Sequence, residues 1–343
     1  MELSCPLPET MPESIQLGHG SGGMMTHQLL EGVVFPAFGN SLLATRHDGA
    51  VMRVGNSRVA FTTDSYVVNP RFFPGGNIGS LAVFGTVNDL AMCGARPSHL
   101  SVGLIAEEGL AIAELTRVVR SMQEAAEAAS VTIVTGDTKV VDRGHGDGLY
   151  INTSGVGICE HSLHIAPSSV RSGDVVLLSG DIGRHGIAVL ARREGLEFEG
   201  AIESDCTSLH RSTLSLVDSG VDVHCLRDLT RGGLATALKD IADGSGLGVD
   251  VVEHQIPLSQ EVHGACELLG LDPLYVACEG RYIAIVPAEQ ADKALEILRA
   301  CPESQGAVQV GVIGESTGVR LESVLGTKRV VDRLPGEQLP RIC

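Results

Sequence analysis

The chain has 343 residues and carries 25 Lys and Arg against 42 Asp and Glu, a formal charge of −17. This balance argues against a nucleic-acid partner, which needs clustered positive charge, and the 43% apolar content excludes wholesale disorder. The length favours two domains. Gly occurs 42 times, aromatic residues make up 3% and Trp is absent, so we expect an aliphatic core with many close backbone approaches.

The predicted elements of the first half follow one another as strand, helix and strand. Alternating apolar and polar residues at 44–68 predict paired strands, and the small residues of 78–92 predict a tightly packed helix. The clearest helical pattern covers 107–130, where apolar residues recur every three or four positions. It leads into predicted strands at 131–135 and 149–158, an order typical of an α/β or α+β domain.

The second half repeats this alternation. Strands are predicted at 175–179, 249–252, 282–286 and 308–313, and helices at 187–193, 209–217, 233–242 and 288–300. We therefore divide the chain into a leader with a Gly-rich loop (1–40), a first domain (41–160), a second domain (170–320) and a tail (326–343). The tail has prolines, many charges and no helical or strand periodicity, so it is predicted to be mobile.

The nine cysteines and the apolar runs bear on where the protein works. The cysteines form no C-x-x-C pair, which leaves a zinc or iron–sulfur site without support. The N-terminus lacks the basic and then apolar run of a signal peptide. The longest uncharged run, 72–88, is broken by Pro74 and two glycines and does not fit a membrane span. We expect a reduced, cytoplasmic protein without membrane association.

A Gly-rich run at 18–23 matches the pattern G-x-G-x-x-G. No strand–helix–strand unit surrounds it, so the match is weak evidence for a dinucleotide fold. Two interpretations stay open, a flexible N-terminal loop and a movable flap whose amides wrap phosphates.

A series of Asp residues is the stronger chemical signal. Each follows an apolar stretch in a predicted loop: Asp48, Asp64, Asp89, Asp137 and Asp228. One such Asp alone is usually a turn former or helix cap, but five in a chain without soft-metal clusters indicate Mg²⁺ held through carboxylates and substrate phosphates. Lys139 could neutralise phosphoryl charge, and residues 231–233, which open a predicted helix, offer amides to an anion.

The C-terminal residue, Cys343, has two interpretations. A terminal Cys without a partner is often incidental. At the end of a Pro-stiffened tail it is also a candidate carrier, exposed, nucleophilic and mobile. Arg341 could stabilise its thiolate or meet phosphate.

Several segments resemble a known family. VNDLAMCG at 87–94, TGDTKVV at 135–141 and RDLTRGG at 227–233 resemble signatures of the PurM-type ATP-binding superfamily. Within it, HGSGG at 19–23 and PRIC at 340–343 resemble the HypE family of hydrogenase maturation factors. The resemblance implies two PurM-like α/β (α+β) domains, the first a mixed sheet or half-barrel that pairs in a homodimer.

The activity implied by the resemblance is that of an ATP-dependent carbamoyl dehydratase. A carbamoyl group, placed on the terminal Cys by the carbamoyltransferase HypF, would be dehydrated to a thiocyanate. The cyanide would then pass to a HypC–HypD complex for the iron of [NiFe]-hydrogenase. Two alternatives remain, another PurM-type synthetase such as selenophosphate synthetase and a non-enzymatic scaffold that docks the same partners. An intact set of Asp residues speaks against the scaffold.

The resemblance also assigns roles to individual residues. The catalytic candidates are Cys343, Lys139 and Glu279, with either Glu279 or Lys139 as the base. Mg²⁺ is expected on the five Asp residues named above. ATP is expected to contact Gly20, Gly22, Gly23, Asn88, Gly136, Thr138, Arg231, Gly232 and Gly233.

Overall fold

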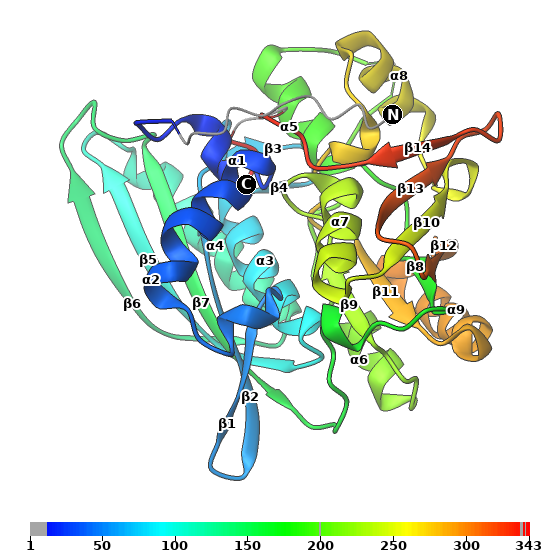
Figure 1. Cartoon of the computed structure of the whole chain (residues 1–343). Helices are drawn as coiled ribbons and strands as arrows, with labels where there is room; N and C mark the ends of the chain where they lie inside the picture. Colours follow the sequence, from blue (N-terminus) through cyan, green and yellow to red (C-terminus); the bar gives the residue numbers. More distant parts are fainter. Residues whose placement is uncertain (1–11, 199, 337–338, 340) are drawn as a thin grey trace.

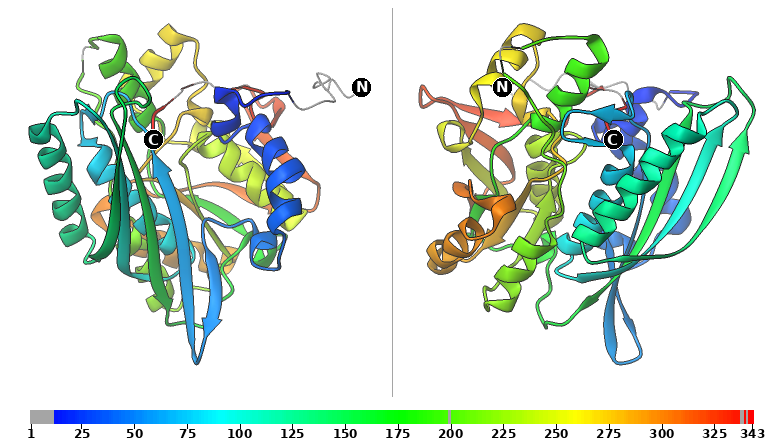
Figure 2. Two further views of the ribbon diagram at one scale, coloured as in Figure 1. Left: turned by 90° about the vertical axis from the view of Figure 1, so that its left-hand side faces the viewer. Right: turned by 180° about the vertical axis from the view of Figure 1, so that it is seen from behind.

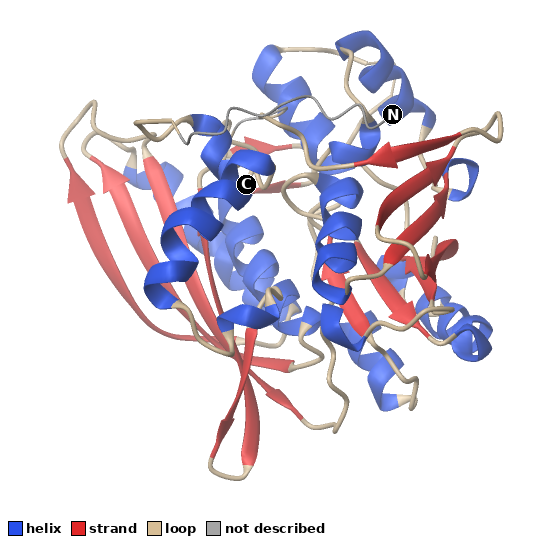
Figure 3. Ribbon diagram, in the orientation of Figure 1, coloured by secondary structure: helices blue, strands red, loops and turns tan. Residues whose placement is uncertain are grey.

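The computed structural model describes residues 12–198, 200–336, 339 and 341–343, and it contains two domains side by side (Figure 1). Each domain is built on its own mixed sheet, and the two sheets lie on opposite sides of the molecule with several helices between them (Figure 3). The expected arrangement of two α/β domains is therefore confirmed. Among the described residues, no helix combines the length and the hydropathy needed to cross a bilayer.

The first domain has a five-stranded sheet in the order β1-β2-β7-β5-β6, in which β5 and β6 are parallel and the other neighbours antiparallel. Its strands are β1 (Ala50–Val54), β2 (Ser57–Tyr66), β5 (Arg96–Glu107), β6 (Thr132–Val141) and β7 (Leu149–Cys159), and a small hairpin joins β3 (Phe72–Phe73) to β4 (Gly76–Asn77). Helices α3 (Ile78–Met92) and α4 (Ile112–Ala128) pack on one another, and α3 lies on the sheet.

Helix α3 is buried on almost all sides, because it contacts the sheet, α4 and also β9 and α6 of the second domain. Its small residues make this packing feasible. A Cβ at Gly79 would collide with the Val118 carbonyl of α4, and one at Gly85 would collide with the Tyr66 hydroxyl of β2. The sequence pattern of 78–92 thus predicted a close-packed helix, and that prediction is confirmed.

Two boundaries in the first domain differ from the sequence-based expectation. The helix expected over 107–130 begins at Ile112, because Glu107 still belongs to β5, a strand that the pattern did not reveal, and residues 108–111 form the turn that follows it. The strand expected over 131–135 runs on to Val141, because it pairs with β5 along its whole length. Residues 136–139 therefore lie inside a strand.

The second domain has a seven-stranded sheet in the order β14-β13-β10-β12-β8-β11-β9. Its strands are β8 (Val175–Leu178), β9 (Cys225–Asp228), β10 (Gly248–Val252), β11 (Tyr282–Val286), β12 (Val308–Gly314), β13 (Gly318–Glu322) and β14 (Lys328–Val331). Its helices are α5 (Arg184–Glu194), α6 (His210–Asp218), α7 (Gly233–Ser245), α8 (Gln260–Leu269) and α9 (Ala291–Arg299), with short turns η4 (Pro167–Ser169), η5 (Glu253–Gln255), η6 (Pro273–Tyr275), η7 (Ala288–Gln290) and η8 (Pro302–Ser304).

Both faces of this second sheet are covered. Val176 and Leu178 of β8 share one cluster with residues of α7, whereas Val175 and Leu177 share another with residues of α6 and α9. A strand buried on both faces reads as a continuous apolar run, which explains the sequence of β8.

The leader and the tail both lie against the junction of the domains. The leader comprises η1 (Leu17–Gly20), α1 (Met24–Leu29), the π-helical turn η2 (Leu30–Val34), α2 (Phe35–Phe38) and η3 (Leu43–Thr45). The segment expected to be a mobile tail contributes β14 to the edge of the second sheet. Its end then enters the space between the domains, where the C-terminus lies (Figure 2).

Candidate active site

Three carboxylates from different elements meet at the domain junction. One carboxylate oxygen from each of Asp48, Asp89 and Asp228 lies within 4.8 Å of the others. Asp48 precedes β1, Asp89 lies in the last turn of α3 and Asp228 ends β9, so both domains contribute. We call these three residues the carboxylate cluster.

Burial and mutual repulsion dominate the electrostatics of the carboxylate cluster. Burial, followed by the charge of Asp48, raises the pKa of Asp228 to about 8, and burial with the charges of Asp228 and Asp64 raises the pKa of Asp89 well above its ordinary value. Arg227 partly offsets this through its Nε, 3.1 Å from Asp48 Oδ1. When ionised, these three carboxylates beside one guanidinium carry an excess of negative charge, and hard oxygen ligands of this kind suit a divalent cation.

The other two Asp residues occupy different environments. Asp64 lies inside β2, near the carboxylate cluster, with Oδ1 3.9 Å from Nη2 of Arg231. Asp137 lies inside β6 and pairs with Lys139 at 2.9 Å, and both side chains are about 70% exposed. The sequence-based placement of Asp64, Asp89 and Asp137 in loops is therefore wrong. Strand pairing and helix packing, which depend on distant segments, extended these elements past the apolar stretches.

The sheet register indicates how far β6 lies from Asp64, which is next to the carboxylate cluster. Asp64 pairs with Thr153, Thr153 with Val102 and Val102 with Gly136, so β6 lies three strand positions away from β2. At roughly 4.8 Å per strand this is about 14 Å. One subunit consequently does not bring Gly136, Asp137, Thr138 and Lys139 to the carboxylate cluster.

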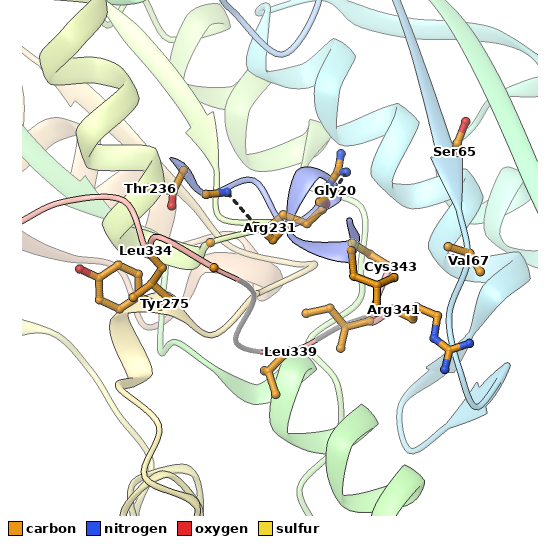
Figure 4. A pocket seen from close by; sticks show the side chains of 16 residues that line it. Gly20, Ser65, Val67, Arg231, Thr236, Tyr275, Leu334, Leu339, Arg341 and Cys343 are labelled. Carbon is orange, nitrogen blue, oxygen red and sulfur yellow. Dashed lines mark hydrogen bonds between the residues drawn. The ribbon is translucent and has the colours of Figure 1, made fainter. Parts of the chain in front are cut away.

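A cavity of about 230 Å³ adjoins the domain junction and contains the end of the tail. Its walls come from the leader (Gly20, Ser21, Gly23), the end of β2 (Ser65, Val67), the start of α7 (Arg231, Gly232, Thr236) and the tail (Leu334, Gly336, Leu339, Arg341, Ile342, Cys343). Figure 4 shows Arg231 beside the leader, where its Nη1 donates to the Gly20 carbonyl at 3.2 Å. The leader, both domains and the tail thus enclose one space.

The terminal Cys343 is seated inside its own subunit. Burial and the neighbouring Glu279 raise the pKa of the Cys343 thiol, whereas Arg231 lowers it. The main-chain oxygen of Cys343 accepts a hydrogen bond from Val67 N at 3.3 Å. Arg341, expected from the sequence beside the thiolate, instead pairs with Asp147 at 2.8 Å, and Arg231 is the guanidinium that acts on Cys343.

Among the charged groups that act on the Cys343 thiol, Glu279 has the largest electrostatic effect. Its side chain is buried, and its Oε1 has no hydrogen-bond partner among the described residues. Burial, with the charges of Asp228 and Asp64, raises its pKa well above the ordinary value. Its backbone N–H donates to Asp205 Oδ1 at 3.1 Å, which holds the residue in place. A carboxylate with a raised pKa binds a proton more strongly than an ordinary one, which is a property of a general base.

The Gly-rich loop packs tightly against the start of α7 and the tail. Gly22 has a φ of +77°, and a Cβ there would lie 2.9 Å from the Arg231 carbonyl; one at Gly23 would lie 2.6 Å from the Leu334 carbonyl. The N–H groups of Gly22 and Gly23 donate to Thr26 Oγ1 and Ser21 Oγ. Because these two amides already have hydrogen-bond acceptors, this conformation does not favour a flap that wraps phosphates. The close packing of Gly22 and Gly23 does not favour a flexible loop either.

The remaining predicted nucleotide contacts have structural roles here. Asn88 donates to the carbonyls of Thr207 and Glu279 and accepts from Leu209 N, so its amide links α3 to the second domain. Gly232, with a φ of +80°, precedes α7, and the Gly233 N–H donates to the Thr230 carbonyl. The sequence analysis did not identify Arg227, whose guanidinium pairs with Asp48 of the carboxylate cluster. Its position next to Asp228 in the sequence was the available signal.

Comparisons with known proteins give one consistent answer. The N-terminal and C-terminal domain models of the AIR synthase related proteins match residues 46–159 and 171–324. The carbamoyl dehydratase HypE of Azotobacter vinelandii is 49% identical over 332 residues, 96% of this chain and 97% of that protein.

Solved structures agree with these matches. A HypE–HypF complex contains a chain with a TM-score of 0.86 and 42% identity, which covers 89% of this chain and 99% of that chain. A HypE in complex with ATP has a TM-score of 0.81 and 45% identity over 96% of this chain and 100% of that chain. The PurM-like two-domain fold implied by the sequence motifs is confirmed.

Proposed function

Because the chain belongs to the HypE carbamoyl dehydratases of the AIR synthase-related family, we propose that it uses ATP to dehydrate a carbamoyl group carried on the Cys343 thiol. The product is a thiocyanate, which supplies cyanide ligands for the iron of [NiFe]-hydrogenase. The observation that carries this proposal is the proximity of Cys343, the last residue of the chain, to Glu279 and Arg231 beside the carboxylate cluster.

The reaction must turn an amide oxygen into a leaving group. The carbamoyl oxygen attacks the γ-phosphorus of ATP, the bond to ADP breaks, and the oxygen leaves later as phosphate. The nitrogen loses two protons as the C–O bond breaks, and a sulfur-bound nitrile remains. Atoms balance as S-carbamoyl-cysteine plus ATP giving S-cyano-cysteine, ADP and phosphate.

Glu279 is our candidate for the proton acceptor within the same subunit. Burial and neighbouring carboxylates raise its pKa, so its ionised form is a stronger base than an ordinary carboxylate. It also acts electrostatically on the Cys343 thiol, whereas Lys139 lies on β6. Arg231, between Asp64 and Cys343, is suited to hold negative charge on the transferred phosphoryl group.

The carboxylate cluster fits Mg²⁺. The negative charge of its ionised form supports this assignment, and so does Asp48 Oδ2, which has no hydrogen-bond partner among the described residues. A bound Mg²⁺ would neutralise the charge of the triphosphate. Asp48, Asp89 and Asp228 would hold the ion, and Asp64 would orient Arg231 at the edge of the same site.

A homodimer would give Lys139 and Asp137 a place in the reaction. The outer face of the first sheet exposes Phe61, Ile105 and Ile158, which suits a second copy better than water. Lys139 of β6 pairs with Ile105 and therefore lies on this face, and so does Asp137, two residues before it. In such a dimer the partner's Lys139 can approach the phosphates, which it does not reach within its own subunit.

The other partners follow from the same chemistry. HypF would load the carbamoyl group on Cys343, as the HypE–HypF complex of a relative suggests, and a HypC–HypD complex would accept the cyanide. The eight described cysteines are all free thiols, which fits a reducing cytoplasm.

Mass spectrometry of the C-terminal peptide tests the proposal. After incubation with HypF and its carbamoyl donor, Cys343 should carry a carbamoyl adduct, and ATP with Mg²⁺ should convert it to a species lighter by one water. Glu279→Gln should accept the carbamoyl group but dehydrate it at least about 100-fold more slowly. A carbamoyl adduct that ATP leaves unchanged in the wild-type protein would falsify the mechanism.

A further inference from the structure

A buried histidine holds the backbone of the docked tail. His185 lies in the first turn of α5, is fully buried, and stands edge-on to the ring of Phe73 with centroids 5.3 Å apart. Its Nε2 lies 2.7 Å from the Ile342 carbonyl oxygen, one residue before Cys343, and its Nδ1 lies 2.8 Å from Ser204 Oγ.

The direction of these hydrogen bonds is fixed by chemistry. Burial lowers the pKa of His185, so its ring is neutral and carries one N–H. The Ile342 carbonyl can only accept, so the proton sits on Nε2, and Nδ1 accepts from the Ser204 hydroxyl. Ser204 Oγ in turn accepts from Cys206 N at 3.0 Å. Each group in this series therefore donates to the next, from Cys206 N through Ser204 and His185 to the Ile342 carbonyl of the tail.

A second residue of α5 holds the preceding carbonyl. Arg193 donates from Nη2 to the Arg341 carbonyl at 2.7 Å and from Nε to the Asn69 carbonyl at 2.7 Å. The Arg341 carbonyl also accepts from Asn69 N at 3.2 Å. Two consecutive tail carbonyls are thus bound from one helix, and Asn69 adds a contact from the first domain.

The tail is bent at this point into a conformation that needs support. Arg341 has a φ of +53°, in the left-handed region that residues with a Cβ seldom adopt. Arg193 binds the carbonyl of Arg341, and His185 binds the carbonyl of the next residue, Ile342. The bend turns the chain so that Cys343 ends beside Glu279.

Apolar contacts fix the register of the tail on α5. The side chains of Leu339 and Ile342 are buried in the same cluster as Ile187 of α5. A Cβ at Gly186 would lie 2.9 Å from Leu339 Cδ1, so the glycine leaves the room that Leu339 occupies. These contacts define the position of the tail along α5.

We propose that Ser204, His185 and Arg193 form a tail clamp that binds the tail backbone and thereby positions Cys343 for dehydration. The inference rests on the proposed function for the meaning of the docked state, and these are positioning residues because His185 and Arg193 bind backbone carbonyls of the tail and Ser204 binds His185. When the tail leaves to be loaded, the buried His185 N–H loses its acceptor, which favours return of the tail.

Two substitutions of His185 distinguish loss of the tail clamp from damage to the fold. In His185→Asn the amide can still meet Ser204 but is too short to reach the tail, whereas in His185→Gln the longer amide can donate to the Ile342 carbonyl. Arg193→Ala removes the second contact. Arg192→Ala, an exposed neighbour on α5, is the matched control.

The measurement is the rate at which iodoacetamide alkylates Cys343 without ATP or carbamoyl donor, followed in the C-terminal peptide. We expect roughly tenfold faster alkylation in His185→Asn and Arg193→Ala, and rates near wild type in His185→Gln and Arg192→Ala. Since this assay needs no catalysis, it remains informative if the proposed dehydration fails. Equal alkylation rates in His185→Asn and the wild type would overturn the clamp.

A second readout connects the clamp to catalysis. In single-turnover dehydration of carbamoylated protein, His185→Asn should be slowed about tenfold while the affinity for ATP stays unchanged, and His185→Gln should recover the rate. A parallel loss of ATP affinity would show a general structural defect instead and would count against a positioning role.

Discussion

The carboxylate cluster and the Asp137–Lys139 pair show how differently two sets of acidic residues behave in one molecule. In the cluster, burial and like charges raise the pKa values of Asp89 and Asp228. On β6, Lys139 and a backbone N–H lower the pKa of the exposed Asp137. Ionisation of the first set is unfavourable unless a cation binds, whereas Asp137 is ionised beside Lys139 with its side chain about 70% exposed. Asp residues in similar sequence contexts thus have their pKa values shifted in opposite directions.

The largest effect should come from Asp89→Asn, which removes one charge from the carboxylate cluster. ATP-dependent dehydration should fall by at least about 100-fold, because the site loses part of its affinity for Mg²⁺. Without divalent cations the same variant should unfold at a higher temperature than the wild type, because a buried like charge is gone. Activity assays and thermal unfolding in EDTA measure the two quantities. A variant that loses both activity and stability would mean that the cluster is a structural network.

Mixing two inactive variants tests whether the exposed pair belongs to a neighbour's site. If Lys139 acts across a dimer, Glu279→Gln and Lys139→Ala subunits that exchange freely should recover about a quarter of the wild-type dehydration rate, because half of the dimers are mixed and each holds one intact site. Each variant alone serves as the control. Recovery that does not exceed the sum of the two separate activities would place Lys139 outside the site.

A smaller effect concerns stability against pH. The folded-state pKa values of Asp89, Asp228 and Glu279 are raised, so the folded state binds more protons than the unfolded chain above pH 4. Their contribution is complete below the unfolded pKa and is lost as pH rises toward about 8, the folded pKa of Asp228. In EDTA the free energy of unfolding should fall by about 1.4 kcal/mol per pH unit for each such group, as denaturant titrations can measure.

Mg²⁺ sharpens the same test. The ion favours ionised carboxylates, so the stability it adds should increase with pH over this range. Asp137→Asn serves as the control, because the pKa of the exposed Asp137 is lowered and the residue stays ionised above pH 4, so the pH dependence of unfolding between pH 4 and about 8 should be unchanged. A stability that rises with pH in EDTA would contradict the buried-charge account.

The sequence predicted the chemistry of the site better than its geometry. The apolar stretches before Asp48 and Asp228 and the small residues of α3 are local signals, and they led to the carboxylate cluster. The position of Asp137 depends on β6 pairing with β5, a strand without a clear local pattern. The seat of Cys343 depends on contacts with α5 and Asn69, far away in the chain. Neither long-range contact leaves a periodicity in the sequence.

The Asn88 amide has a consequence for how substrates enter. It ties the end of α3 to three backbone groups of the second domain, and the carboxylate cluster beside it draws its members from both domains. A hinge motion that moved the domains apart would break this link and separate the three carboxylates of the cluster. We therefore expect the gate of this enzyme to consist of its two chain ends, the Gly-rich leader and the tail, which cover the cavity while the domains stay fixed.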